Sequence, residues 1–357
     1  MTGRGIDQVL PHPGDPRLFE PYVRTATTYV ELAEKANGPI PKPVDYSYIW
    51  GDALAELDRV APAVRIINLE TSVTTSDGRW RRKQIHYRMH PANLACLTAA
   101  AIDCCVLANN HVLDWGTAGL AETLDTLQRA GIATAGAGRD LRAATTPAVL
   151  EAGADTRVLV FGFGTASSGI PEEWAARESR PGLNFLPDLS RRSVERVAES
   201  VQRVKREGDL VVASIHWGGN WGYEVVRAVR EFAHALIDEA GADLIHGHSS
   251  HHPKGVEVYR DRPIIYGCGD LLNDYEGIAG YERFRSDLVL LYFPSLDPTD
   301  GRLVRFQMSP LRIRRFRLNR ASKDDAEWLR AMLTREGEAL GTRLEAGPDS
   351  TLTLRWE

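Results

Sequence analysis

Residues that can bind a cation or transfer a proton follow five short apolar runs in this sequence. They are Glu70, the group Asn110, His111 and Asp114, then His216, the pair His248 and His251, and Asp270. The carboxyl ends of parallel strands meet at one edge of a sheet, so five such motifs point to a single site. Any one of them alone could merely cap a helix or satisfy loop amides.

Imidazole nitrogens combined with carboxylate and amide oxygens suit a borderline or hard divalent cation. We predict that one divalent metal ion (calcium, manganese, zinc or iron) is bound by Glu70, Asn110, His216, His248 and His251. None of the four cysteines is placed to add a thiolate, and we expect them to be buried free thiols.

Aromatic side chains adjoin the same motifs. Trp217 directly follows His216, and Trp221 comes four residues later. The two tryptophans either belong to the core or line an apolar substrate pocket beside the ion. We assign Trp217 and Trp221, together with Arg88, to substrate binding.

The elements that must position these residues follow from the spacing of apolar side chains. Steps of three and four predict amphipathic helices from Leu120 to Leu127, from Val194 to Val204 and from Val225 to Leu236. Each predicted helix is followed by a glycine and then by a strand that is too apolar to have a solvent-exposed face. This order is typical of βαβ units and a parallel sheet.

Beyond residue 253, short β-rich runs separated by turns predict antiparallel sheet. We expect the arginines 312, 314, 315 and 317 to form the solvated face of one strand. A helix is expected over 323–340 and a last strand over 351–356. Together the elements predict an α/β fold in which two sheets are covered by helices.

The composition narrows the class of protein. The chain has 357 residues, of which 43% are hydrophobic and 25% charged, which excludes a disordered chain. A net charge of −5 argues against a nucleic-acid partner, which would need a basic face. No apolar stretch reaches the roughly 18 residues of a membrane span, and the first residues lack the apolar core of a secretion signal. We predict a cytoplasmic protein without a membrane segment.

Two weaker motifs favour neither nucleotide binding nor serine hydrolysis. The run Gly136-Ala137-Gly138 lacks the G-x-G-x-x-G spacing of a phosphate-binding loop. The glycines and serines over 162–169 contain no G-x-S-x-G nucleophile motif.

The sequence resembles the CapA family, the poly-γ-glutamate capsule-synthesis type, within the calcineurin-like metallophosphoesterase superfamily. The resemblance runs from residue 1 to about 320 and rests on Asn68-Leu69-Glu70, Ala108-Asn109-Asn110-His111, His216-Trp217-Gly218, Gly247-His248 and Gly269-Asp270. It implies a calcineurin-like two-sheet β-sandwich flanked by helices over residues 1–320, with the metal site at the C-terminal ends of the strands. Residues 321–357 would form a helix–strand extension packed on that domain.

The resemblance also implies roles for single residues. Glu70 would replace the bridging carboxylate, Asn110 would supply the ligand amide, and His111 would be the acid–base histidine. The family opens with a strand ending in Gly-Asp-Val whose aspartate is a ligand, and we expect upstream codons to supply that strand here. One carboxylate fewer suits one ion and proton transfer better than the usual pair of ions.

Three functions are compatible with this sequence. The family is similar to enzymes that epimerise a residue of a lasso-peptide precursor, which would need a base and an acid on opposite faces of a Cα. We take this as the main interpretation, with a peptide substrate and with His111, Asp114 and Asp270 as catalytic residues. The alternatives are a poly-γ-glutamate synthesis factor or metallohydrolase of the CapA type, and a non-catalytic peptide- or metal-binding module.

Overall fold

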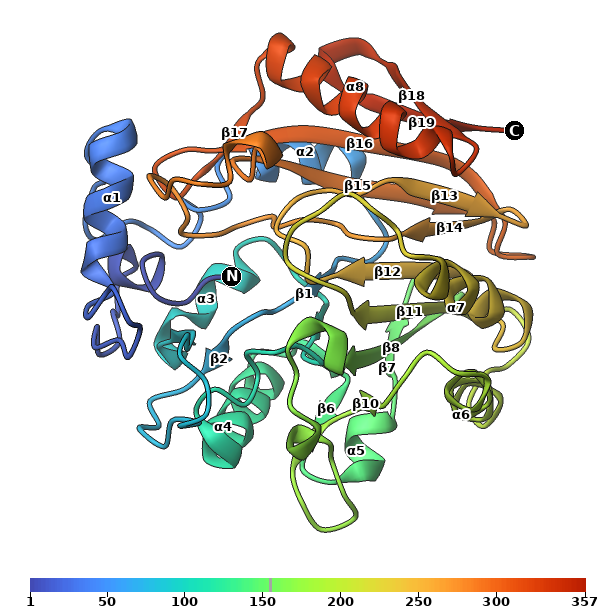
Figure 1. The fold of residues 1–357 in the computed structure, drawn as a ribbon, viewed down its shortest axis with the longest axis horizontal. Coiled ribbons are helices and arrows are strands. Elements are labelled where there is room, and N and C mark those ends of the chain that lie inside the picture. The colour runs from blue at the N-terminus through green and yellow to red at the C-terminus, as the bar shows by residue number, and fades with distance from the viewer. Residues whose placement is uncertain (154–155) are drawn as a thin grey trace.

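The computed structural model describes residues 1–153 and 156–357 and confirms the α/β class (Figure 1). The largest sheet has seven strands. In spatial order they are β10 (Phe185–Leu186), β8 (Arg157–Thr165), β11 (Leu210–His216), β12 (Leu244–His248), β14 (Arg262–Ile265) and β13 (Val256–Tyr259), with β7 (Ala148–Glu151) also paired to β8. Strands β8, β11, β12 and β14 are mutually parallel. The sequence predicts this for β11 and β12, which follow predicted helices. The antiparallel sheet predicted beyond residue 253 is wrong in part, because β14 is antiparallel to β13 and parallel to β12.

A second, smaller parallel sheet packs against the first. It consists of β1 (Ile66–Asn68), β4 (Cys104–Val106) and β5 (Ala133–Ala135). Apolar side chains of β4 and β5 share one buried cluster with those of β8 and β11. The carboxyl ends of both sheets therefore face the same region of the molecule.

Glycines bring the backbones of the two sheets together. A Cβ added to Gly162 in β8 would lie 2.8 Å from the Cα of Gly136, and one added to Gly164 would lie 3.1 Å from the carbonyl oxygen of Ala108. Such distances leave no room for a side chain. This contact gives Gly136 a packing reason to be a glycine.

The three predicted helices are present. Helix α4 (Gly116–Arg129) packs on the small sheet, and α6 (Arg191–Gln202) and α7 (Arg227–Asp238) cover one face of the large sheet. The apolar steps of α6 and α7 are buried against β8 and β11. In Figure 1, α6 and α7 lie at the right of the molecule.

The C-terminal part of the chain, from residue 288 onward, forms a five-stranded antiparallel sheet. Its strands are β15 (Leu288–Leu296), β16 (Leu303–Ile313), β17 (Leu318–Arg320), β18 (Thr342–Ala346) and β19 (Leu352–Trp356), and α8 (Lys323–Glu338) covers it. Helix α8 and strand β19 agree with the sequence-based prediction. The extension is joined to the preceding residues by hydrogen bonds, because β19 pairs with β16.

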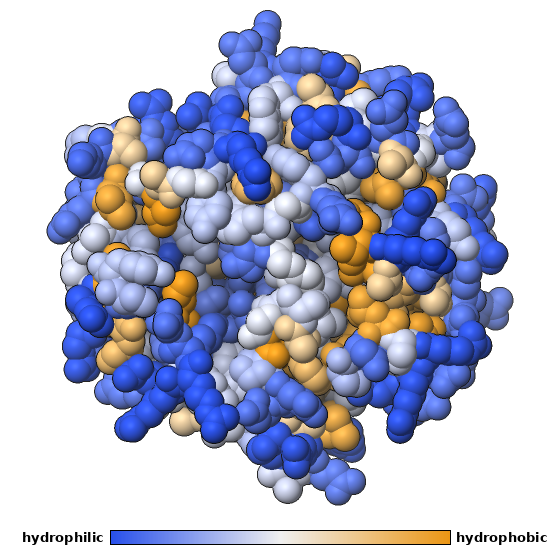
Figure 2. All heavy atoms as spheres, viewed as in Figure 1, coloured by the Kyte–Doolittle hydropathy of each residue, from blue (hydrophilic) through white to orange (hydrophobic). Residues whose placement is uncertain are grey.

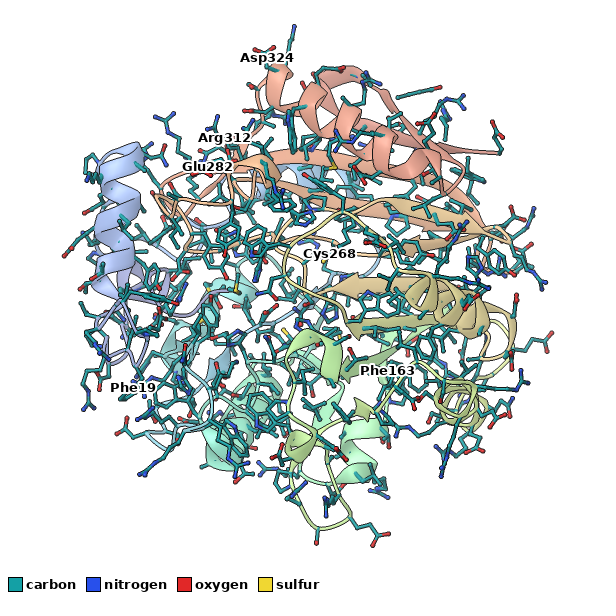
Figure 3. The ribbon with its side chains drawn as sticks, in the orientation of Figure 1. Phe19, Phe163, Cys268, Glu282, Arg312 and Asp324 are labelled. Carbon is teal, nitrogen blue, oxygen red and sulfur yellow. The ribbon has the colours of Figure 1, made fainter. Side chains whose placement is uncertain are left out.

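The prediction that the arginines near residue 315 lie along a single strand is wrong in part. Strand β16 ends at Ile313, and the chain turns through positive φ at Arg315 and Phe316 before β17. Arg312 lies in β16 (Figure 3). Its guanidinium forms ion pairs with Asp287 at 3.0 Å and with Asp325 at 3.3 Å. Burial of Phe316 fixes the turn, so the arginines on either side cannot alternate along one strand.

The described residues form more sheets than the two that the sequence predicts. The described residues form three larger sheets and two small pairs, β2 (Ser72–Val73) with β3 (Arg88–Met89), and β6 (Ala137–Gly138) with β9 (Gly182–Leu183). Membership of the calcineurin-like fold stays a prediction. Among residues 1–153 and 156–357, no helix has the length and apolar character needed to cross a bilayer.

We expect the buried carboxylate of Glu257 in β13 to be a strong contributor to stability near neutral pH. It accepts a 2.6 Å hydrogen bond from Arg230 of α7 and another from the Tyr266 hydroxyl. Burial alone would raise the pKa of Glu257, but these donors lower it overall. A lowered pKa stabilises the fold above the unfolded-state value of about 4.3, and this gain is lost as the pH falls through the folded-state pKa.

The variant Glu257→Gln should therefore lose about 1–3 kcal/mol of unfolding free energy at pH 7. It should also show a flatter loss of stability below about pH 4.3 than the unchanged protein. Urea unfolding at several pH values measures both, with Glu231→Gln, an exposed carboxylate of α7, as the control. Equal pH dependence in Glu257→Gln and the unchanged protein would contradict the argument.

Candidate metal and acid–base site

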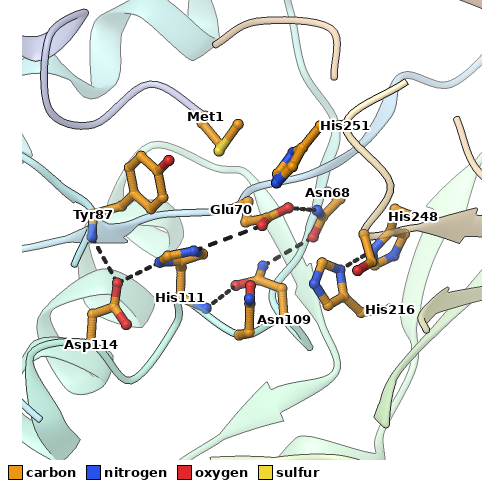
Figure 4. A network of polar contacts seen from close by, with 12 residues as sticks. Met1, Asn68, Glu70, Tyr87, Asn109, His111, Asp114, His216, His248 and His251 are labelled. Atoms are coloured by element: carbon orange, nitrogen blue, oxygen red, sulfur yellow. Dashed lines mark hydrogen bonds and ion pairs between the residues drawn. The ribbon is translucent and has the colours of Figure 1, made fainter. Parts of the chain in front are cut away.

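The side chains predicted from the strand ends come together at one place (Figure 4). Glu70 follows β1, Asn110 and His111 follow β4, His216 ends β11, and His248 ends β12. In Figure 2 the middle of the face seen in Figure 1 is hollowed, and hydrophilic residues form the floor of the hollow. The parallel pairing within each sheet and the packing between the two sheets produce this convergence.

His111 and Asp114 form a tight pair. The Nδ1 atom of His111 lies 2.6 Å from Asp114 Oδ2, and the backbone N–H of Tyr87 donates to the same oxygen at 2.7 Å. The edge of the Tyr87 ring faces the imidazole, with ring centres 4.2 Å apart. Burial, together with the positive charge of Lys83, lowers the pKa of His111 well below its usual range. The lowered pKa favours the neutral imidazole, and when Nδ1 donates to Asp114 the lone pair lies on Nε2.

Glu70 lies on the open side of this pair. Its Oε1 is 4.0 Å from His111 Nε2, and its Oε2 accepts a 3.0 Å hydrogen bond from Asn68. Asn109 donates to Asn68 at 3.0 Å and accepts from the backbone N–H of His111, also at 3.0 Å. Burial raises the pKa of Glu70, so an isolated Glu70 carboxylate is costly here and gains from a nearby cation.

His216 and His248 form a second group, from the large sheet. Their Nδ1 atoms are 2.7 Å apart, and His248 Nε2 lies 3.1 Å from the hydroxyl of Ser214. When His248 donates from Nε2 to Ser214, its Nδ1 accepts from His216 Nδ1, and His216 Nε2 is left as a bare lone pair. Burial lowers the pKa of both histidines. Both nitrogens of His248 are thus engaged, and this residue orients His216.

His251 and Asp270 form a third group. His251 Nδ1 lies 3.1 Å from Asp270 Oδ1, and Asn273 donates to the other oxygen at 3.0 Å. Burial alone would lower the pKa of His251, but the Asp270 carboxylate raises it overall. The same ion pair lowers the pKa of Asp270, whose burial acts in the opposite direction. The Asp270 carboxylate thus favours the protonated form of His251, whereas the surroundings of His111 favour its neutral form.

Two buried polar atoms in this region have no hydrogen-bond partner within the described residues: Asn110 Oδ1 and His216 Nε2. An unpaired buried acceptor costs about 1–3 kcal/mol, and a cation would satisfy both. An amide oxygen, an imidazole nitrogen and the Glu70 carboxylate form a donor set that a divalent ion accepts. These residues fit a metal.

The metal site predicted from the sequence is nevertheless not closed by the side chains alone. In the part of the chain that the structure describes, no three His, Cys, Asp or Glu side chains lie close enough together to hold an ion. His251 is turned to Asp270, and Glu70 to Asn68 and His111. The Asn110 amide is therefore needed to complete any such site, and metal binding itself stays a prediction.

The predicted substrate-binding residues separate into core and rim. Trp217 is buried and donates to the carbonyl of Tyr266, so it belongs to the core of the large sheet. Arg88 is also buried; it donates to Ser76 O and stacks on Trp115 at 3.9 Å. Their roles in substrate binding stay predictions.

Trp221 alone of the three lies at the rim. It is half-buried, stacks on Tyr281 with ring centres 4.0 Å apart, and lies 5.4 Å from the ring of His251. Its role in substrate binding stays a prediction.

Several site residues were missed by the sequence analysis. Lys83 enters the site from the loop between β2 and β3 and lies 2.7 Å from Asp114 Oδ1. Tyr275 contacts His251 Nε2 at 3.5 Å and the Tyr87 hydroxyl at 3.0 Å. Asn68 and Asn109 belong to the motifs quoted above, and their closeness in sequence to Glu70 and His111 could have indicated that they are site residues. No local sequence pattern indicates that Lys83 and Tyr275 contact the site.

Comparisons with known proteins agree on one family. The family described as "Bacterial capsule synthesis protein PGA_cap" matches residues 1–275. A Mycobacterium tuberculosis protein named "Probable polyglutamine synthesis accessory protein" is 51% identical over 356 residues, covering 99% of this chain and 93% of the relative.

More distant relatives come from bacilli. "PGA biosynthesis protein CapA" of Bacillus subtilis is 28% identical over 247 residues, covering 69% of this chain and 60% of the relative. "Capsule biosynthesis protein CapA" of Bacillus anthracis is 27% identical over 210 residues, covering 59% and 48%. These names match the CapA-type alternative of the sequence analysis. They do not support the lasso-peptide epimerase that was its main interpretation.

Proposed function

Because the chain belongs to the bacterial capsule synthesis family PGA_cap, we propose that it is a metal-dependent accessory enzyme of polyglutamate synthesis. Its substrate would be a glutamyl peptide or polymer, and its reaction the hydrolysis of an amide bond of that chain. The names of the relatives supply the substrate class, and the site supplies the chemistry.

One observation carries the proposal. The two unpaired buried acceptors, Asn110 Oδ1 and His216 Nε2, come from different sheets and accompany a buried carboxylate, Glu70. Beside them stands a neutral imidazole, His111, whose Nδ1 side is fixed by Asp114. The site therefore combines acceptor atoms that could bind a cation with an imidazole that could accept a proton.

The proposal assigns a separate role to each of the site residues. Glu70, Asn110 and His216 would hold the ion, and His248 would orient His216. A divalent ion in such a site polarises a carbonyl and makes bound water more acidic. His111 Nε2 would take the proton of the attacking water and return it to the leaving amine nitrogen as the C–N bond breaks. Water thus supplies OH to the carbonyl carbon and H to the nitrogen.

The test has a metal arm and an activity arm. The protein as purified should contain a divalent ion by elemental analysis, and His216→Ala should lose most of it while keeping its circular dichroism and unfolding midpoint. His12→Ala, a change in an exposed histidine outside the site, should keep the ion. Poly-γ-glutamate incubated with the unchanged protein should become shorter and gain free amines, and a chelator should stop this.

The outcomes separate the alternatives. Deuterium uptake at a Cα of a glutamyl peptide in heavy water, without chain cleavage, would replace hydrolysis by epimerisation. Binding of the polymer without either reaction would leave a non-catalytic module. Absence of an ion, together with indifference to chelator, would overturn the proposal as a whole.

A further inference from the structure

We propose that the loop between β2 and β3 is a docking surface for the carboxylates of an acidic chain, which bind to Arg79, Arg81 and Arg82. The inference rests on the proposed function in one respect, because a glutamyl polymer is the acidic chain on which the site would act. Binding to the three arginines can be measured without any reaction, so the two proposals can fail separately.

The charge of this loop is opposite to that of the whole protein, which carries a net charge of −5. Residues 75–85 contain one acidic side chain, Asp77, and four basic ones, which are Arg79, Arg81, Arg82 and Lys83. Asp77 is paired with Arg88 at 3.2 Å, and Lys83 is turned inward to Asp114. The three arginines remain, and their side chains are exposed or half-buried.

Two of these arginines are free of carboxylate partners. Within residues 1–153 and 156–357, the ion pairs of this loop involve Asp77, Arg82 and Lys83, and none involves Arg79 or Arg81. Arg82 pairs with Glu173 at 3.0 Å, but both side chains are exposed, by 80% and 52%, so this pair is weak. A free guanidinium can bind a carboxylate through two parallel N–H donors.

Arg79 is held in place before any ligand binds. Its guanidinium lies over the ring of Phe19, 3.9 Å from the ring centre, and Phe19 contacts the rings of His86 and Trp115. Figure 3 labels Phe19 at the lower left of the molecule, on the side where Figure 1 shows β2. The ring covers only a face of the guanidinium, and its N–H edge stays available. Binding at Arg79 therefore orders little that is not already ordered.

The backbone of the loop is fixed to the acid–base pair of the site. The Trp80 N–H donates to the carbonyl of Asp114 at 2.7 Å, and Lys83 Nζ lies 2.7 Å from Asp114 Oδ1. The three arginines are the immediate sequence neighbours of these two residues. The loop thus places positive charge beside the site, where the carboxylates that flank a bound amide bond would meet it.

Fluorescence anisotropy of a labelled γ-glutamate oligomer tests the proposal on full-length protein treated with chelator, so that binding is measured without turnover. The triple variant Arg79→Gln/Arg81→Gln/Arg82→Gln should bind the oligomer about 5–50-fold more weakly, since each exposed ion pair contributes roughly 1.5–5-fold. At about 1 M salt, where the Debye length falls to about 3 Å, this difference should largely disappear.

The matched control removes the same charge elsewhere. Arg191→Gln/Arg192→Gln/Arg203→Gln changes three exposed arginines in and directly after helix α6, and it should alter the affinity less than about twofold, because salt screens distant exposed charges. Equal weakening by both triple variants would show that net charge acts rather than the loop, and would overturn the proposal. Failure of the unchanged protein to bind the oligomer would overturn it as well.

A double variant covers the case in which loss of the Arg79–Phe19 contact lowers the unfolding midpoint. Arg81→Gln/Arg82→Gln changes exposed side chains only, and it should weaken binding about 2–20-fold relative to Arg191→Gln/Arg192→Gln. Equal affinities of these two double variants would contradict the proposal. Tighter binding of single-stranded DNA than of the oligomer, through the same arginines, would replace the acidic chain by a nucleic acid.

Removal of the competing carboxylate should act in the opposite direction. Glu173→Gln frees Arg82 and should tighten binding of the oligomer by roughly 1.5–5-fold. Glu195→Gln, a change in an exposed carboxylate of α6 that pairs with Arg191, should leave the affinity unchanged. Unchanged or weaker binding in Glu173→Gln would exclude Arg82 from the docking surface.

The results also separate this inference from the proposed function. Cleavage of the polymer by the unchanged protein, with an affinity that the three arginines do not affect, would remove the docking surface and leave the hydrolase. Binding that depends on the arginines, without cleavage when the metal is present, would remove the hydrolase and leave the docking surface.

Discussion

Replacement of His111 by glutamine is expected to lower kcat on the glutamyl substrate about 10²–10⁴-fold, the range that a positioned acid–base group supplies. Glutamine cannot accept a proton at neutral pH. The bound ion should remain at the level of the unchanged protein, because His111 Nε2 faces Glu70 at 4.0 Å and Asn110 and His216 carry the unpaired acceptors.

Two measurements, steady-state kinetics and elemental analysis, check this result on one preparation. His12→Gln, in an exposed loop, is the matched control and should behave like the unchanged protein. Loss of the ion together with activity would make His111 a ligand. Retention of full activity would remove it from the reaction altogether.

The largest effect on stability is expected from Arg4→Met. Arg4 is buried between two buried carboxylates, at 2.8 Å from Glu20 and 2.6 Å from Asp274. Its guanidinium also lies over the rings of Tyr29, at 3.9 Å, and Tyr87, at 4.4 Å. Removing one partner of a buried ion pair typically costs about 3–5 kcal/mol, because the remaining charge is left without compensation.

Urea unfolding should show that loss for Arg4→Met and a change below about 1 kcal/mol for Arg17→Met, whose exposed ion pair is the matched control. The triple variant Arg4→Met/Glu20→Gln/Asp274→Asn removes all three charges and should recover much of the loss. A cost for Arg4→Met as small as that of Arg17→Met would show that the two carboxylates are satisfied without it.

The acid–base pair could be predicted from the sequence because it is local. His111 and Asp114 are three residues apart behind one strand, and the distance between them depends on a single turn of chain. Glu70, Asn110 and His216 could be placed near one another for a related reason: Glu70 and Asn110 lie just beyond the parallel strands β1 and β4, His216 ends the parallel strand β11, and parallel sheets bring such positions together.

Residues whose place depends on the path of a loop could not be predicted. In sequence, Lys83 ends a run of exposed basic residues, and nothing local shows that it alone turns inward. Trp217 and Trp221 share one motif, yet the turn at Gly218, with φ of 72°, leaves Trp217 in the core and Trp221 at the rim. The strand β18 was missed because it forms only by pairing with β19.

The backbone contact between the two sheets has a consequence for how this site could diversify. His216 lies directly opposite Gly164 in the paired strands, and a Cβ added to Gly164 would lie 3.1 Å from the carbonyl oxygen of Ala108, two residues before Asn110. The gap across which an ion or a scissile bond must fit is therefore set by main-chain atoms on both sides. Even one methyl group at Gly164 would require the facing backbone to shift by a few tenths of an ångström. We therefore expect the width at this point to change less readily by substitution than the surrounding loops, such as those that carry Lys83 and Trp221.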